Sequence, residues 1–184
     1  MDSNFLYMRN HPFLVNGLNS LILEAGNYLG SLSEAKMVEV GSYLGESTII
    51  FANHFREVSA IDPFVNDYDS NDPTCNHADL NIVYEAFKQN TLPFKNINHF
   101  RLTSDSFFES CDCSDVDFFY IDGVHTYAQT KKDILNCLAY KGRKKIVISG
   151  HDFSHSWSGV MDAVNETLGT PDMCFEDTSW IKFL

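Results

Sequence analysis

Apolar residues recur along the chain in two patterns, and the two patterns predict different secondary structures. A leading helix is indicated over 11–30, where the apolar residues recur every three or four positions. Short apolar runs between turn-forming residues predict strands. The predicted strands are 37–40, 57–62, 96–103, 116–122 and 145–150. The further predicted helices are 47–55, 77–90, 126–140 and 158–169.

The order of these elements predicts an α/β fold. Strands and helices alternate through the chain, and two short strands follow near 173–177 and 179–184. Alternation of this kind predicts a mostly parallel central sheet with helices on both faces, here with a C-terminal antiparallel strand. No repeat or linker divides the sequence, so we expect a single domain over 1–184, with an N-terminal helical segment (1–35) and a core (36–184). Ligands of such sheets bind outside the carboxyl ends of the strands.

Charge and composition narrow the partners and the compartment. The 184 residues carry a formal charge of −12, which repels phosphate backbones and anionic membranes. We therefore expect no nucleic acid and no membrane as a partner. The chain contains no apolar run of about 18 residues and no secretory signal pattern at its start. Its 5 cysteines, an odd number, predict ordinary thiols in a reducing compartment and a cytoplasmic location.

The ends of the first two predicted strands suit a nucleoside. Gly41 and Gly45 lie in EVGSYLGES, where they allow a tight turn, and the helix that follows offers free N–H groups. The second strand ends at Asp62, about 20 residues later, and a carboxylate there accepts hydrogen bonds from both ribose hydroxyls. The glycine spacing differs from that of dinucleotide sites, which favours S-adenosylmethionine over NAD. A plain strand–helix turn and a solvated loop acid remain the alternatives.

Four ordered segments of the chain resemble class I S-adenosylmethionine-dependent methyltransferases. They are VEVGSYLGEST (38–48), VSAIDPF (58–64), FYIDGVHTYAQTKKDI (119–134) and IVISGHDF (146–153). The sequence is most similar to the small-molecule and sugar O-methyltransferase branch, which includes catechol-type and macrocin-type enzymes and methyltransferase domain 24. The resemblance implies a Rossmann-like methyltransferase fold, S-adenosyl-L-methionine as cofactor, and methyl transfer to a hydroxyl of a small molecule or a sugar.

The same resemblance implies roles for individual residues. Contacts with the cofactor are implied for Glu39, Gly41, Ser42, Gly45, Ser47, Asp62, Ser104, Asp105 and Asp122. Glu39 and the two glycines would surround the methionine portion, and Asp62 would bind the ribose. Ser104 and Asp105, read as the end of the third strand, would lie near the adenine. Asp122 would lie below the transferred methyl group.

Two acids end neighbouring strands of the predicted sheet, which raises the question of a metal. Asp122 ends the fourth strand and Asp152 the fifth, and carboxylates brought so close repel unless a proton or a cation separates them. A divalent ion such as Mg²⁺ or Mn²⁺, held by Asp122, His151 and Asp152, would meet this need. The sequence His151-Asp152 departs from the Asp-Asp or Asp-Asn of metal-dependent relatives, and imidazole suits Mn²⁺, Fe²⁺ or Zn²⁺ better than Mg²⁺. In the alternative, Asp152 caps the next helix and Asp122 only orients the cofactor.

A hydroxyl acceptor must lose a proton, and histidine is the natural group to remove it. His125 is the predicted general base and His151 the second candidate, because imidazole titrates near neutrality. Thr126 and Gln129 predict a capping box that opens the crossover helix after Asp122. The segment 63–76 reads as a solvated loop that is long enough to cover the site.

Three kinds of protein fit these observations to different degrees. The leading hypothesis is an O-methyltransferase whose acceptor is a small molecule or a sugar. The alternative is a non-catalytic protein that binds the cofactor or a partner on a methyltransferase-like fold, and an NAD-dependent enzyme is disfavoured by the glycine spacing. In a chain this short, we expect the N-terminal helix and the segment 63–76 to form most of the acceptor pocket, with a second subunit of a homo-oligomer as a further contributor.

Overall fold

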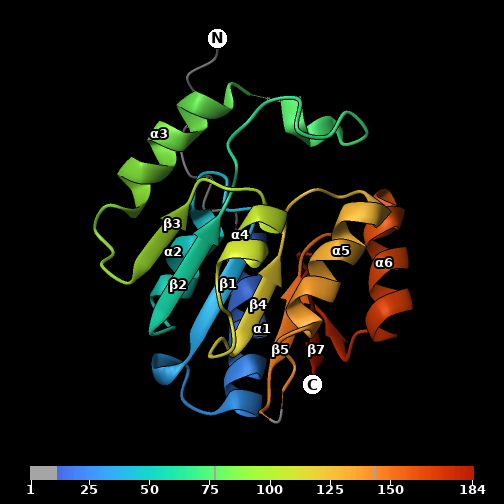
Figure 1. Cartoon of the computed structure of the whole chain (residues 1–184). Coiled ribbons are helices and arrows are strands. Elements are labelled where there is room, and N and C mark those ends of the chain that lie inside the picture. Colours follow the sequence, from blue (N-terminus) through green and yellow to red (C-terminus); the bar gives the residue numbers. More distant parts are fainter. Residues whose placement is uncertain (1–11, 77, 143) are drawn as a thin grey trace.

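The short apolar runs of the sequence form one twisted sheet. The computed structural model describes residues 12–76, 78–142 and 144–184, and within this part seven strands pair in the order β3-β2-β1-β4-β5-β7-β6 (Figure 1). The strands are β1 (Lys36–Val40), β2 (Glu57–Ile61), β3 (Ile97–Phe100), β4 (Phe118–Ile121), β5 (Val147–Gly150), β6 (Met173–Cys174) and β7 (Trp180–Phe183). Strands β1 to β5 are parallel, and β7 runs antiparallel to both β5 and β6. The predicted mostly parallel sheet with a C-terminal antiparallel strand is confirmed.

Helices cover both faces of the sheet. They are α1 (Pro12–Leu29), α2 (Glu46–Ala52), α3 (Leu80–Thr91), α4 (Ser104–Ser110), α5 (Tyr127–Leu138) and α6 (Ser158–Leu168). Alternate residues of β4 point to opposite faces, so Phe118 packs in the cluster with α1 and α2, whereas Phe119 packs in the cluster with α4, α5 and α6. The central strands are therefore apolar on both sides, which explains their nearly continuous hydrophobic runs.

One helix lies where the sequence predicted only the end of a strand. Thr103 is the N-cap of α4, and its hydroxyl oxygen accepts a hydrogen bond from the backbone N–H of Ser106 at 3.1 Å. The ring of Phe107 is buried against Phe100, with ring centroids 4.9 Å apart. The predicted strand 96–103 is therefore too long, because this cap turns the chain into a helix.

The capping box predicted at the start of α5 is wrong. Thr126 occupies the N-cap position, but its side chain makes no capping hydrogen bond and instead donates to Asp69 at 3.4 Å. The side chain of Gln129 donates to Ser104 at 3.2 Å and to Asp133 at 3.0 Å. Both side chains are thus used to join α5 to neighbouring segments rather than to close its first turn.

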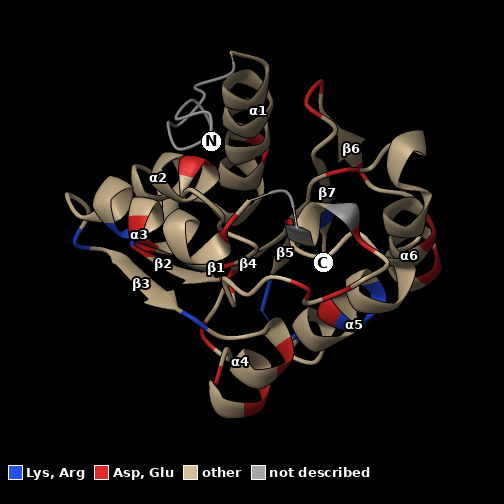
Figure 2. Ribbon diagram, turned by 90° about the horizontal axis from the view of Figure 1, so that it is seen from above, with Lys and Arg blue, Asp and Glu red and all other residues tan. Residues whose placement is uncertain are grey.

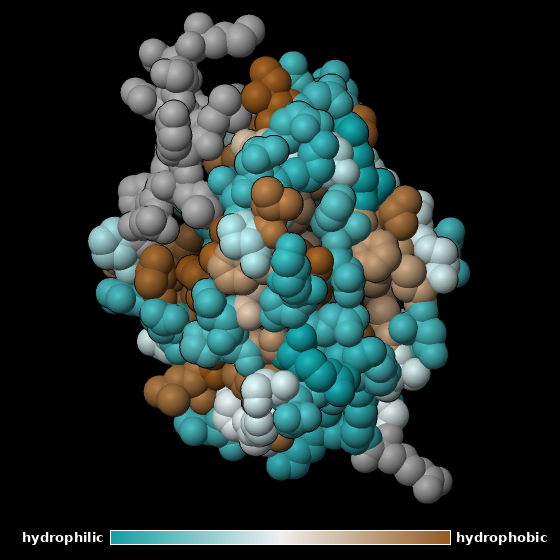
Figure 3. All heavy atoms as spheres, turned by 90° about the vertical axis from the view of Figure 1, so that its left-hand side faces the viewer, coloured by the Kyte–Doolittle hydropathy of each residue, from teal (hydrophilic) through white to brown (hydrophobic). Residues whose placement is uncertain are grey.

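Among the described residues, no helix is both long and apolar enough to cross a membrane. On the face shown in Figure 3, the apolar side chains lie in small groups separated by hydrophilic ones. Figure 2 looks down on the carboxyl ends of the strands and shows acidic residues in the loops at that edge, where the candidate site lies.

Candidate active site

A cavity of about 290 Å³ lies at the carboxyl ends of β1, β2 and β4. Its walls come from the turn between β1 and α2, the segment 63–76, the start of α4 and the turn between β4 and α5. The residues with a predicted role that line it are Gly41, Ser42, Ser47, Asp62, Ser104, Asp122 and His125. The fold thus brings residues from four separate segments of the sequence to one cavity.

The conformation of Gly41 is required by the neighbouring strand. Its φ of +86° lies in the left-handed region, and a side-chain Cβ there would stand 2.0 Å from the backbone oxygen of Asp122. Gly45 also has a positive φ, of +84°, and packs against the side chain of Thr91. The first glycine therefore allows the ends of β1 and β4 to approach each other closely.

Asp62 is held so that part of its carboxylate remains available. One oxygen accepts a hydrogen bond from the backbone N–H of Tyr43 at 3.0 Å, and the other accepts one from Phe64 at 2.8 Å. The backbone N–H of Ser42 also contacts this carboxylate, and three such donors leave acceptor capacity on a residue that lines the cavity. The hydroxyl of Ser42, on the same wall, is buried and has no hydrogen-bond partner among the described residues. These groups fit the hydroxyl-rich nucleoside of S-adenosylmethionine.

Glu39 lies behind the cavity wall. Its side chain is fully buried, and its two oxygens accept hydrogen bonds from the hydroxyls of Ser47 and Thr48, each at 2.5 Å. Burial raises the pKa of Glu39 to about 8, against the effect of these two hydrogen bonds. Glu39 therefore does not line the cavity itself but holds the side chain of Ser47, which does.

The two residues expected near the adenine differ in their positions. Ser104 lines the cavity, and its hydroxyl accepts a hydrogen bond from Gln129. Asp105 faces α5 instead and forms an ion pair with Lys132 at 2.6 Å. Both residues belong to the first turn of α4 rather than to the end of a strand.

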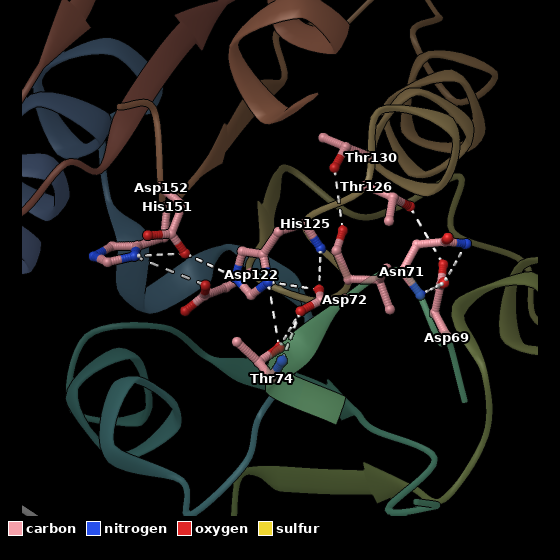
Figure 4. Close-up of polar contacts among 11 residues, drawn as sticks. Asp69, Asn71, Asp72, Thr74, Asp122, His125, Thr126, Thr130, His151 and Asp152 are labelled. Carbon is pink, nitrogen blue, oxygen red and sulfur yellow. Dashed lines mark hydrogen bonds and ion pairs between the residues drawn. The ribbon is translucent and has the colours of Figure 1, made fainter. Parts of the chain in front are cut away.

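A cluster of acids and imidazoles adjoins the cavity at the ends of β4 and β5 (Figure 4). Asp152 has an oxygen 2.8 Å from Nε2 of His125 and 3.3 Å from Nδ1 of His151. The same Nδ1 of His151 lies 3.9 Å from an oxygen of Asp122. The catalytic and metal-binding candidates of the sequence therefore lie together, and Asp122 and His125 belong both to the cluster and to the cavity wall.

The alternative in which Asp152 caps the following helix is wrong. The N-cap of α6 is Trp157, and the short helical turn before it begins after Ser154. Asp152 has a left-handed backbone, with φ of 60°, and its side chain contacts the two histidines. Its role is therefore in the cluster.

Positive charge on the two histidines would neutralise the negative charge of the neighbouring carboxylates. Burial works to lower the pKa of both rings, but the surrounding carboxylates outweigh it and raise the pKa of His125 and of His151 to about 9 each. Burial opposes a low pKa for Asp152, but its hydrogen bonds to the two rings hold that pKa well below the usual range. At neutral pH, two imidazolium rings thus separate the carboxylates. In this arrangement His125 has no free lone pair with which to accept a proton.

The contact of Asp72 with His125 was not predicted from the sequence. The side chain of Asp72 is fully buried, although the sequence places it in a segment predicted to be a solvated loop. One of its oxygens accepts hydrogen bonds from the backbone N–H of His125 at 2.6 Å and from Nδ1 of the same ring at 2.8 Å. Its other oxygen binds the backbone N–H of Thr74 at 2.9 Å, a local Asx turn that the sequence Asp-Pro-Thr favours. The prediction of a solvated loop is wrong for this residue.

The donor atoms present also fit a divalent metal ion. Asp122, His151 and Asp152 each offer one ligand atom, and these atoms lie within 4.8 Å of one another. Within the described part of the chain, Nε2 of His151 is buried without a hydrogen-bond partner. Two carboxylates and one imidazole form a set that suits Mn²⁺, Fe²⁺ or Zn²⁺.

The mostly parallel sheet, with a cavity at the carboxyl ends of its strands, defines a class of protein, that of the Rossmann-like methyltransferase fold. A family model described as a methyltransferase domain matches residues 38–153, which is more than half of the chain. The chain belongs to this methyltransferase domain family. No curated protein sequence matches the chain.

Solved structures with low sequence identity share the fold. The N-methyltransferase NodS from Bradyrhizobium japonicum is 15% identical with a TM-score of 0.57, over 96% of this chain and 97% of that one. Cofactor-bound Rv0187 from MTB is 12% identical with a TM-score of 0.60, over 91% and 78%. Phosphoethanolamine N-methyltransferase 1 from Haemonchus contortus, in complex with phosphoethanolamine and S-adenosylhomocysteine, is 15% identical with a TM-score of 0.54, over 78% and 27%. This chain thus spans about a quarter of the length of that last protein.

Proposed function

We propose that this protein transfers the methyl group of S-adenosylmethionine to a hydroxyl of a small molecule or a sugar. The proposal rests on the position of Asp122, which belongs both to the cavity wall and to the acid–imidazole cluster. Its side chain lines the cavity together with Gly41, Ser42 and Asp62, and it also lies 3.9 Å from His151 in the acid–imidazole cluster. A cofactor bound along that wall would meet the cluster at the end of β4.

The reaction requires in-line placement and the removal of one proton. The acceptor oxygen attacks the methyl carbon, a new carbon–oxygen bond forms, and the electron pair of the carbon–sulfur bond goes to sulfur. We assign the hydroxyl proton to Asp122, because burial raises the pKa of this carboxyl and makes it a better base than an exposed acid. His125 and His151 stay protonated at neutral pH and hold Asp152 as their counter-ion.

We also propose that the cluster takes a divalent metal ion. Asp122, His151 and Asp152 would hold it once the proton on His151 had been displaced, and the imidazole favours Mn²⁺ over Mg²⁺. When bound, such an ion supplies a Lewis acid for the acceptor oxygen.

A binding titration and an acceptor screen test the proposal. The wild-type protein is titrated calorimetrically with S-adenosylhomocysteine and with NAD, and only the first is expected to bind. The protein is then incubated with methyl-labelled S-adenosylmethionine and a panel of catechols, sugars and amines, with and without added Mn²⁺. Mass spectrometry of the labelled product identifies the methylated atom.

The Asp122→Asn variant separates catalysis from binding. We expect methyl transfer to fall by about 100-fold or more while the Kd for S-adenosylhomocysteine changes by less than about threefold. Absence of cofactor binding by the wild-type protein favours a non-catalytic role in binding a partner, and a methyl group on nitrogen contradicts the hydroxyl acceptor. If transfer is unchanged both in Asp122→Asn and after chelation, neither the proton acceptor nor the metal is correctly assigned.

A further inference from the structure

The segment 63–76 forms one wall of the cofactor cavity. It leaves the end of β2, crosses above the carboxyl edge of the sheet and returns to the start of α3 (Figure 1). Val65, Tyr68, Thr74 and Cys75 of this segment line the cavity, opposite the turn between β1 and α2. A cofactor bound between these two walls would be partly covered by the segment.

The near end of the segment is fixed at Phe64. Its ring is buried and packs against Tyr84 and Phe87 of α3, with ring centroids 4.9 Å and 5.5 Å apart. Its φ of 49° is unusual for a bulky residue and marks a sharp change of chain direction just after Asp62. Motion of the segment is therefore expected beyond Phe64 and not at the cofactor-binding turn itself.

The far end of the segment is held by one buried side chain. Asp72 accepts hydrogen bonds from both the backbone N–H and the ring Nδ1 of His125, at 2.6 Å and 2.8 Å. Two longer contacts also join the segment to this turn. Thr126 donates to Asp69 at 3.4 Å, and the Thr74 hydroxyl lies 3.4 Å from the same ring nitrogen of His125. The two short bonds of Asp72 thus dominate this attachment.

The same contact fixes the ring of His125. Asp72 holds Nδ1, Asp152 holds Nε2 at 2.8 Å, and Trp157 stacks on the ring with centroids 4.2 Å apart at 24°. In Figure 4 the His125 ring lies between the two carboxylates. If the segment lifted, this ring would lose one of its two hydrogen-bond partners.

We propose that Asp72 is the latch of a lid formed by the segment 63–76, and that closing this lid over the cofactor also completes the acid–imidazole cluster. The inference rests on the proposed function, because it takes the cavity to be the cofactor site. Asp72 is a positioning residue, since it acts through His125 and through the cavity wall. Lids that assemble a site as they close couple the binding of a ligand to its chemistry.

The test measures how fast S-adenosylhomocysteine leaves the protein. Its dissociation rate is measured for the wild-type protein and for the Asp72→Ala and Asp72→Asn variants by surface plasmon resonance. We expect Asp72→Ala to raise the dissociation rate by about tenfold or more, and Asp72→Asn, which keeps an acceptor oxygen for the His125 amide, to raise it less. Asp69→Asn is the matched control, because it removes an acid from the same segment but keeps an acceptor oxygen for the long bond from Thr126, and it is expected to stay within about twofold of wild type.

Hydrogen exchange at the backbone amide of His125 reports directly on its hydrogen bond to Asp72. The backbone amide of His125 donates to Asp72, so its hydrogen exchange should be slow in the complex with S-adenosylhomocysteine and fast in Asp72→Ala. Thermal unfolding shows whether each variant is folded, and Asp72→Asn replaces Asp72→Ala if the latter is not. Equal dissociation rates in the Asp72 variants and Asp69→Asn, or unchanged exchange at His125, would overturn the latch. Failure of the wild-type protein to bind S-adenosylhomocysteine would instead overturn the proposed function.

Discussion

The two halves of the site are held together by different kinds of contact. In the proposed cofactor half, the acids bind partners close in sequence: Asp62 accepts from Tyr43, 19 residues away, and Glu39 accepts from Ser47, 8 residues away. In the proposed catalytic half, which is the acid–imidazole cluster with Asp72, His125 binds Asp72, 53 residues away, and Asp152, which follows β5. The first half is fixed by two neighbouring turns, whereas the second exists only when distant segments have assembled.

Because the contacts of the two halves differ in sequence separation, substitutions in the two halves should have different effects. A substitution in the cofactor half should act mainly on cofactor binding, because its partners lie within the same pair of turns. A substitution in the catalytic half should act on the chemistry and on the closure of the segment 63–76. The two halves meet where Gly41 packs against the backbone of Asp122.

The largest effect is expected where the halves meet. In Gly41→Ala, the added Cβ would stand 2.0 Å from the Asp122 carbonyl oxygen, on a backbone with φ of +86°. We expect the free energy of unfolding in urea to fall by about 3 kcal/mol, from steric overlap together with left-handed strain. Gly26→Ala is the control: its nearest neighbour would be Leu32 at 3.7 Å, and it lies within α1. A small gain of up to about 1 kcal/mol is expected there. Equal effects of the two substitutions would mean that the halves do not touch as described.

The next effect separates the halves directly. Asp62→Ala removes the acceptor for the ribose and leaves the N–H groups of Tyr43 and Phe64 without their partner. We expect the Kd for S-adenosylhomocysteine, measured by calorimetry, to rise by about 100-fold, or about 2.7 kcal/mol. Asp152→Asn should leave that Kd within about threefold. A loss of affinity in Asp152→Asn as large as in Asp62→Ala would show that the two halves bind the cofactor as one unit.

A smaller effect concerns the pH dependence of stability. Burial raises the pKa of Glu39 to about 8 in the folded protein, above its ordinary value of 4.5, so the folded state keeps a proton that the unfolded state releases. The stabilisation is complete below about pH 4.5 and is lost as the pH rises towards 8. Relative to wild type, Glu39→Gln should therefore gain about 2 kcal/mol of unfolding free energy between about pH 6 and about pH 7.5.

Urea unfolding of both proteins across this range checks the sign. Exposed Glu34 supplies the control, since Glu34→Gln should track the wild-type protein to within about 0.5 kcal/mol. If the wild-type slope persists in Glu39→Gln, the pH dependence arises in the catalytic half and not at this buried acid.

Local patterns in the sequence were enough to predict most of the sheet. Each core strand is a short apolar run, because parallel strands covered on both faces must be apolar on both faces. The helix α4 was missed because its polar first residues, Ser104 and Asp105, were read as the end of the preceding strand. Its start was nevertheless detectable, since Thr103 caps the backbone of Ser106 three residues later.

The candidate site could be predicted only where strand ends bring residues together. The expected positions of Asp62, Asp122 and Asp152 follow from the rule that parallel strands end at one edge of the sheet. Asp72 lies in a loop, and nothing in its neighbours indicates that its partner is 53 residues away. Which loop folds onto which turn is decided by packing across the whole domain, and a single sequence does not display that packing.

Because Trp157 stacks on His125, the site can be followed by tryptophan fluorescence. The chain has 2 tryptophans, and the other, Trp180, donates its indole N–H to the backbone oxygen of His151 at 3.2 Å. Trp157 thus contacts the ring of His125, whereas Trp180 contacts the backbone of His151. The tryptophan fluorescence of this protein therefore arises next to both histidines of the cluster. Events in the catalytic half can therefore be followed in the unlabelled protein.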